Sequence, residues 1–95
     1  MKILALEREI PGASIEQFKQ HSNSEAARVW ELYQVGVLRE LYFRADQRTA
    51  VLILECKDPD DASQILGTLP FVESDLIEFE IIPLVPYDGF ERLFK

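Results

Sequence analysis

The sequence predicts an α+β fold in which two helices cover one face of a four-stranded antiparallel sheet. Hydrophobic residues alternate at every second position in four segments and recur at helical spacing in two others. The resulting order is β-α-β-β-α-β, the split βαβ or ferredoxin-like arrangement. A chain of 95 residues has room for one such domain, residues 1–95.

The first strand and the first helix have sequence signals at both ends. Residues Lys2–Glu9 alternate, so one face of this strand is expected to carry Ile3, Ala5, Glu7 and Glu9. Ser14 followed by Gln17 is a capping box, and Gly36 suits the left-handed position after a helix. A helix is therefore expected over residues 15–34. Its buried stripe is expected to contain Ile15, Phe18, Ser22, Ala26, Val29, Trp30 and Tyr33.

Residues 37–45 and 49–56 are expected to form a hairpin of two strands. The later strand is β-branched and aliphatic, and it is nonpolar on both sides near its centre. Simple alternation along the earlier strand places Leu38 and Tyr42 opposite Leu41 and Phe43. The sheet face without helices is therefore expected to be partly apolar.

The second helix has a strong start signal. Asp58 is placed to cap it, and Pro59 suits its first turn. Gly67 and Pro70 are expected to end this helix, and a last strand follows over residues 75–84.

The apolar sheet face and the apolar C-terminal tail both predict self-association. Pairing two sheets in a homodimer or higher oligomer would bury the exposed face and leave a cavity between the sheets. The tail, residues 85–95, is expected to dock on its own subunit or on a neighbouring one.

Composition argues against several classes of partner. The net charge of −7 and the absence of a basic run disfavour nucleic acid and membrane surfaces. The single Cys56 favours a cytoplasmic setting, and one His with one Cys is too few for a typical metal site. With no glycine-rich phosphate loop, no cofactor and no metal are expected.

Three segments of the chain resemble a known family. They are residues 36–42, the Thr-Leu-Pro-Phe turn at 68–71, and residues 77–84, where Glu alternates with aliphatic residues. Together they resemble the muconolactone isomerase family of dimeric α+β barrels. The resemblance implies subunits that pair through their sheets, assemble into larger rings, and shift a double bond in a lactone acid by cofactor-free proton transfer. Where the isomerases of that family have an aromatic residue and a histidine on the second strand, this sequence has Leu38 and Glu40.

Proton transfer needs a base and an acid whose pKa values lie closer to neutrality than usual. The candidate catalytic residues are Glu40, Arg39, His21 and Glu25. The candidate substrate-binding residues are Glu7, Tyr42, Glu78 and Glu80. The alternative for each strand carboxylate is ordinary solvation or cross-strand pairing.

Two pairs among these candidates leave alternatives open. Arg39 and Glu40 are adjacent, so only one of them is expected to enter the cavity. Arg39 would anchor a ligand carboxylate, whereas Glu40 would remove a proton. His21 and Glu25 lie four residues apart on the first helix, either as an acid–base pair or as an ordinary surface pair.

Three functions therefore remain open. The first is a cofactor-free isomerase acting by proton transfer on a small carboxylic acid or lactone. The second is a non-catalytic ligand-binding or structural oligomeric domain, and cofactor-independent oxygenation is a third use of the same architecture. The discriminating feature is whether two ionisable side chains converge in one cavity.

Overall fold

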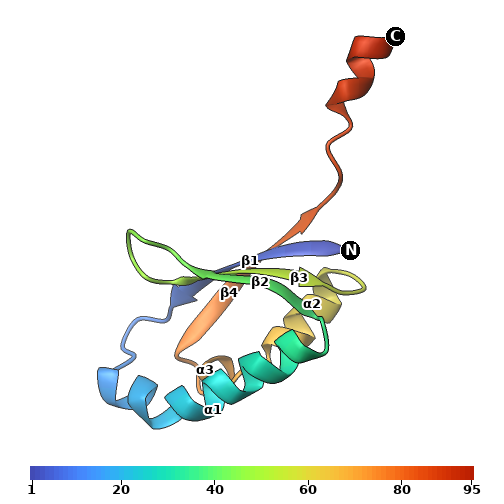
Figure 1. The fold of residues 1–95 in the computed structure, drawn as a ribbon. Coiled ribbons are helices and arrows are strands. Elements are labelled where there is room, and N and C mark those ends of the chain that lie inside the picture. Colours follow the sequence, from blue (N-terminus) through green and yellow to red (C-terminus); the bar gives the residue numbers. More distant parts are fainter.

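Four strands form one antiparallel sheet with the spatial order β2-β3-β1-β4 (Figure 1). The strands are β1, Lys2–Glu9; β2, Leu38–Phe43; β3, Ala50–Glu55; and β4, Ile77–Leu84. The structure is a computed structural model and describes all of residues 1–95.

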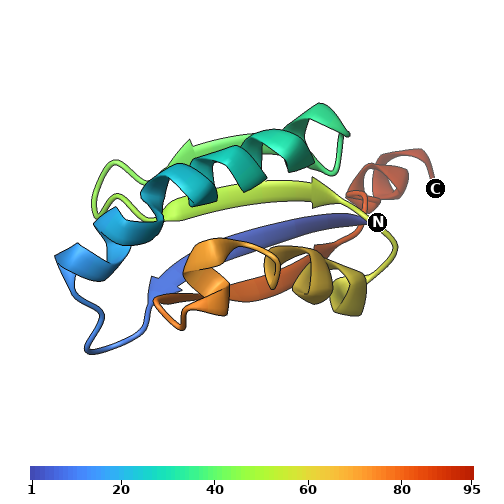
Figure 2. The ribbon, with the colours of Figure 1, turned by 90° about the horizontal axis from the view of Figure 1, so that it is seen from below.

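Three helices lie on one face of this sheet. They are α1, Ile15–Gln34; α2, Pro59–Leu66; and α3, Pro70–Glu73. Figure 2 shows α1 crossing over β2 and β3, whereas α2 and α3 lie over β1 and β4. The predicted α+β fold class, with its ferredoxin-like order of elements, is confirmed. None of the helices combines the length and hydropathy needed to cross a bilayer.

The sequence signals around α1 act as expected. The Ser14 hydroxyl accepts the amide N–H of Gln17 at 3.2 Å, and the Gln17 side chain accepts the amide N–H of Ser14 at 2.9 Å. Gly36, just after the helix, has φ of +83°, a conformation that costs least at glycine. The bounds of β1 and α1 are those expected from the sequence.

The N-cap of α2 gives a first testable prediction. The Asp58 carboxylate accepts the amide N–H of Asp61 at 2.8 Å, which satisfies one of the free donors of the first turn. Asp58→Ala is expected to lower the free energy of unfolding by about 1 kcal/mol in urea denaturation. The matched control is Asp60→Ala, which removes an exposed carboxylate from the same turn without removing the cap. Equal losses in the two variants would show that the cap adds nothing.

The helix α3 differs from expectation. The sequence predicts Pro70 only as a helix terminator, but in the structure Pro70 also begins α3. Proline fits the first helical position because its missing N–H has no partner there. This short helix carries Phe71, whose side chain lines a cavity between α1 and the sheet.

The alternation expected along β2 is wrong, because the strand contains an irregularity at Arg39. The register with β3 skips this residue between Leu38 and Glu40. An extra residue in one strand shifts all later side chains to the opposite face. Leu38 and Leu41 consequently both face the helices, whereas Glu40 and Tyr42 face the other side of the sheet.

The buried stripe expected on α1 is wrong in part. Leu32, which the stripe omitted, is the buried residue of this helix. Five of the seven stripe residues are instead exposed: Ile15, Ser22, Ala26, Trp30 and Tyr33. The inward side of α1 includes the half-buried polar residues His21 and Glu25. His21 and Glu25 interrupt the apolar periodicity of the inward side. The sequence pattern therefore assigned the exposed Trp30 and Tyr33 to the buried stripe.

The hydrophobic core lies between the helices and the sheet. Its buried residues are Ile3, Ala5, Leu32, Leu38, Leu52, Leu54, Ala62, Leu66 and Leu69. The strand residues of this set alternate, so each strand presents its apolar side to the helices.

The opposite face of the sheet carries no helix, and we call it the uncovered face. Its half-buried aliphatic side chains are Leu4, Leu6, Val51, Ile53, Ile82 and Leu84. The expectation of a partly apolar second face is therefore confirmed.

The C-terminal tail, residues 85–95, extends away from the rest of the chain and ends in a short 3₁₀ helix, η1, Gly89–Phe94 (Figure 1). Its apolar side chains are more than half exposed; they are Val85, Tyr87, Phe90, Leu93 and Phe94.

Candidate functional site

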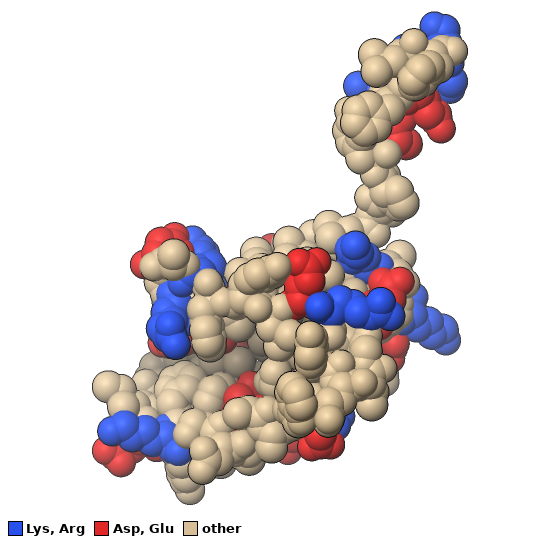
Figure 3. All heavy atoms as spheres, viewed as in Figure 1, with Lys and Arg blue, Asp and Glu red and all other residues tan.

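A cavity of about 400 Å³ lies between α1 and the helix-facing side of the sheet. Figure 3 shows the molecule hollowed below the β2–β3 hairpin, with acidic atoms in a mostly uncharged wall. Ten of the thirteen lining residues are hydrophobic. The wall consists of Glu7, Ser22, Glu25, Ala26, Val29, Leu41, Tyr42, Phe43, Ala50, Leu52, Leu69, Phe71 and Phe79. This cavity lies within one chain, on the side of the sheet opposite to the one expected.

Glu7 lies on the sheet wall of the cavity. The alternation of β1 places it on the same face as the buried Ile3 and Ala5. Its Oε1 accepts the amide N–H of Ala50 at 3.2 Å. Burial raises the pKa of Glu7, the hydrogen bond from Ala50 lowers it, and the charge of Glu9 raises it further. The net effect is a carboxyl group that holds its proton more tightly than usual.

Glu25 lies on the helix wall of the same cavity. Its Oε1 accepts the amide N–H of Phe71 at 2.9 Å. That N–H belongs to the first turn of α3, where the helix itself offers no acceptor. Burial raises the pKa of Glu25, the hydrogen bond from Phe71 lowers it, and the charge of Glu7 raises it. The two carboxyl groups therefore interact across the cavity.

The raised pKa of Glu25 predicts how stability depends on pH. The folded protein binds this proton more tightly than the unfolded chain, in which the pKa is near the ordinary value of 4.5. Its contribution to stability is therefore fully present below pH 4.5 and is lost as pH rises through the raised pKa. Glu25→Gln keeps the oxygen that accepts the Phe71 N–H and removes the ionisation. We expect this variant to melt at a higher temperature than the wild type at neutral pH, with the gain disappearing at acidic pH.

Thermal unfolding followed by circular dichroism across the pH range measures this effect. The matched control is Glu16→Gln, at an exposed position on the same helix. An equal pH dependence for wild type and Glu25→Gln would contradict the raised pKa of the Glu25 carboxyl group.

His21 lies one turn before Glu25 but outside the cavity wall. Its Nε2 is 3.3 Å from the hydroxyl of Ser74, just after α3. The imidazole is half-buried, so it packs between α1 and the α3 region rather than lying on an open surface. It does not line the site with Glu25.

Tyr42 and Glu40 pair on the uncovered face. The Tyr42 hydroxyl donates to Glu40 Oε1 at 2.7 Å, and this hydrogen bond raises the pKa of Tyr42. Tyr42 borders the cavity although its hydroxyl pairs with Glu40 on the uncovered face, and Glu40 does not border the cavity. The charge of Glu40 thus lies on the opposite side of the sheet from Glu7.

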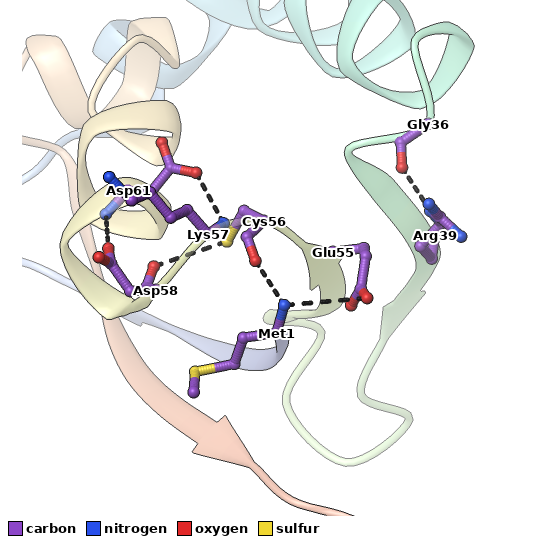
Figure 4. Close-up of polar contacts among 8 residues, drawn as sticks. All are labelled: Met1, Gly36, Arg39, Glu55, Cys56, Lys57, Asp58 and Asp61. Carbon is purple, nitrogen blue, oxygen red and sulfur yellow. Dashed lines mark hydrogen bonds and ion pairs between the residues drawn. The ribbon is translucent and has the colours of Figure 1, made fainter.

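Arg39 also lies away from the cavity. Its Nε donates to the carbonyl oxygen of Gly36, as Figure 4 shows. This contact keeps the guanidinium near the C-terminal end of α1. Neither Arg39 nor Glu40 lines the cavity.

Glu78 and Glu80 lie on the uncovered face of β4. Arg8 Nε is 3.7 Å from Glu78 Oε1, a cross-strand ion pair between exposed groups. Neither carboxylate lines the cavity. Of the eight predicted site residues, the cavity brings together Glu7, Glu25 and Tyr42.

The aromatic walls of the cavity were missed by sequence reasoning. They come from Phe43, Phe71 and Phe79. Phe71 is held edge-on against Phe18, with ring centroids 5.1 Å apart. Pro70 is compatible with a helix start, but it does not by itself predict the one-turn helix α3, which orients the Phe71 ring and its N–H.

No other cluster competes with this cavity for chemistry. Nowhere do three or more His, Cys, Asp or Glu side chains gather in a way that would hold a metal ion. Cys56 lies near Asp58 (Figure 4), and burial raises the pKa of its thiol, which favours the unreactive form.

Comparisons with known proteins show which family model the chain matches and which solved structures share its fold. A family model described as muconolactone delta-isomerase matches residues 5–89. The fold is similar to a crystal structure of muconolactone isomerase, with 15% identity, a TM-score of 0.76, and coverage of 94% of this chain and 93% of that one. It is also similar to a 5-chloro-2-hydroxyhydroquinone dehydrochlorinase from Burkholderia phenoliruptrix AC1100, in complex with 2,5-dihydroxybenzoquinone. That match has 15% identity, a TM-score of 0.70, and coverage of 94% and 98%. No curated protein sequence matches significantly.

Proposed function

Because the chain belongs to the muconolactone delta-isomerase family, we propose that it is a cofactor-free enzyme that moves a proton within a small cyclic carbonyl compound. The observation that supports this proposal is the placement of Glu7 and Glu25 on facing walls of one apolar cavity. Two carboxyl groups whose pKa values are both raised by burial can supply a base and an acid near neutral pH.

The environments of the two groups suggest their roles. The proposal assigns Glu7 as the base and Glu25 as the acid, because a negative charge on Glu7 raises the pKa of Glu25. Each uses Oε1 to accept a backbone N–H, which fixes its orientation and leaves Oε2 without a partner in the protein.

The reaction conserves all atoms. Ionised Glu7 takes a proton from a carbon beside the ligand carbonyl, and the electron pair of that C–H bond passes into the conjugated system. Protonated Glu25 gives its proton to the far carbon of that system, which shifts the double bond. Proton exchange with water then restores both groups. The apolar wall lowers the local dielectric around both groups, which strengthens their electrostatic interactions.

The two fold relatives support this class of chemistry. By their names, one is an isomerase and the other a dehydrochlorinase. Shifting a double bond and eliminating a chloride both begin when a base removes a proton, and Glu7 is placed to supply such a base here.

The second candidate function is ligand binding without turnover. The large apolar cavity favours it, since it would hold a small organic molecule even if neither carboxyl group reacted. Both functions use the same cavity. They differ in whether the protein exchanges protons with the bound ligand.

Deuterium incorporation separates the two functions. The protein is incubated in D₂O with β,γ-unsaturated five-membered lactones, and NMR follows both the position of the double bond and the uptake of deuterium. The proposal expects both changes with the wild type and neither with Glu7→Gln/Glu25→Gln. The control Glu73→Gln, at an exposed position on α3, should match the wild type. Binding of the lactones without any exchange would favour the second candidate.

We also propose that the protein is a homo-oligomer in the cytoplasm. The uncovered face and the exposed apolar tail support self-association. The free Cys56 fits a reducing compartment.

Sedimentation tests the assembly. Ile53, at the centre of the uncovered face, is half-buried in the single subunit. Ile53→Lys is expected to reduce the oligomer to monomers while the circular dichroism spectrum stays unchanged, because pairing of the sheets would bury the new charge.

Removal of the tail after Leu84 is expected to leave a smaller oligomer than the full chain forms. A molar mass of 11.0 kDa for the wild type in sedimentation equilibrium, which is the mass of one chain, would contradict self-association.

A further inference from the structure

We infer that the cavity accepts uncharged cyclic ligands and rejects carboxylates, a substrate class that rests on the function proposed above. The charges of the wall support this inference. The thirteen lining residues include Glu7 and Glu25 but no Lys, Arg or His. A ligand carboxylate would enter as a third acidic group among apolar side chains, where a charge is costly unless it is paired.

The arginines near the cavity are engaged outside it. Arg48 stacks on the ring of Phe43, with its Cζ 4.6 Å from the ring centroid. Arg44 donates two hydrogen bonds to Asp46, at 2.9 and 2.7 Å. Arg28 donates through Nε to a threonine hydroxyl beyond α2, at 2.9 Å. None of these groups lines the cavity, so none pairs with a ligand carboxylate there.

Arg39, which the sequence predicted as a possible anchor for a ligand carboxylate, does not line the cavity. Its guanidinium donates to Gly36 O and is absent from the cavity wall. A free lactone acid would therefore lack its counter-charge in this subunit. An ester, a lactone without a free acid, or a hydroxylated ring avoids the problem.

The shape of the cavity favours a ring. Its volume of about 400 Å³ is within the range of small-molecule sites, and its wall carries the rings of Phe43, Phe71 and Phe79. Ionised Glu7 accepts a hydrogen bond from a ligand hydroxyl, and protonated Glu25 donates one to a ligand carbonyl. Both carboxyl groups of the site thus match an uncharged ring with oxygen substituents.

A pair of probes that differ mainly in charge tests this inference. Benzamide and benzoate are each titrated into the full-length protein at neutral pH, with binding measured by calorimetry. We expect benzamide to bind and benzoate to bind at least about tenfold more weakly. In Glu7→Gln/Glu25→Gln, which keeps both accepting oxygens, benzoate is expected to bind at least about tenfold more tightly than to the wild type. Glu73→Gln removes an exposed charge and should keep the wild-type ratio.

Each other result overturns the inference. Benzoate binding as tight as benzamide binding would show that a cation completes the site, for example from a second copy. Failure of both probes to bind would show that the cavity does not take rings. Because the readout is binding, a protein that prefers benzamide but catalyses no proton exchange would keep this inference and overturn only the proposed function.

Discussion

Replacing Glu7 with glutamine is expected to slow proton transfer by about 10²–10⁴-fold, the usual contribution of a positioned general base. The amide keeps an oxygen that can accept the Ala50 N–H, so the cavity wall keeps its geometry. The variant loses the carboxylate that takes up the proton, because an amide is not basic enough to do so. The rate of double-bond shift in D₂O, measured on folded variant and wild type, gives this ratio directly.

The pH profile distinguishes a base from a structural residue. In the wild type the rate should rise as Glu7 loses its proton and fall as Glu25 loses its own, and burial raises the pKa of both above 4.5. Glu7→Gln should remove the rising limb from whatever activity remains. A variant that is slower but keeps the complete wild-type profile would show that Glu7 only shapes the cavity.

Truncating Leu54 to alanine is expected to lower the free energy of unfolding by about 2–5 kcal/mol. Leu54 is completely buried, between Ile3 of β1 and Leu38 of β2 in the sheet register. The loss combines the removed hydrophobic contacts with the empty space left behind. A domain of this size has a total stability of about 5–15 kcal/mol, so the variant should unfold at a much lower urea concentration.

An exposed position provides the control for this truncation. Ile15 is 74% exposed at the start of α1, so Ile15→Ala should change stability by no more than about 0.5 kcal/mol. Similar losses for Leu54→Ala and Ile15→Ala would contradict the assignment of the core.

The sequence predicted those parts of the fold that local signals determine. The capping box at Ser14, the glycine at position 36 and the Asp58 cap mark helix ends through contacts between near neighbours in the chain. The bulge at Arg39 depends on how β2 pairs with β3, so simple alternation assigned the wrong faces after it.

The candidate site was predicted in part for the same reason. Regular alternation in β1 placed Glu7 on the face of Ile3 and Ala5, and this placement is correct. Glu25 was identified as a candidate, but its interaction with Glu7 joins residues far apart in sequence and depends on the packing of α1 against the sheet. The α3 wall could not be predicted from a pattern of one turn, because so short a helix forms through tertiary contacts.

The most direct test of the account is an NMR titration of the Glu7 and Glu25 side-chain carboxyl groups by ¹³C chemical shift. The account predicts that both pKa values lie above 4.5 and that Glu7→Gln lowers the pKa of Glu25, because it removes a facing negative charge. Ordinary pKa values for both groups, or a Glu25 titration unchanged by Glu7→Gln, would contradict the claim that the two carboxyl groups share one proton-transfer site.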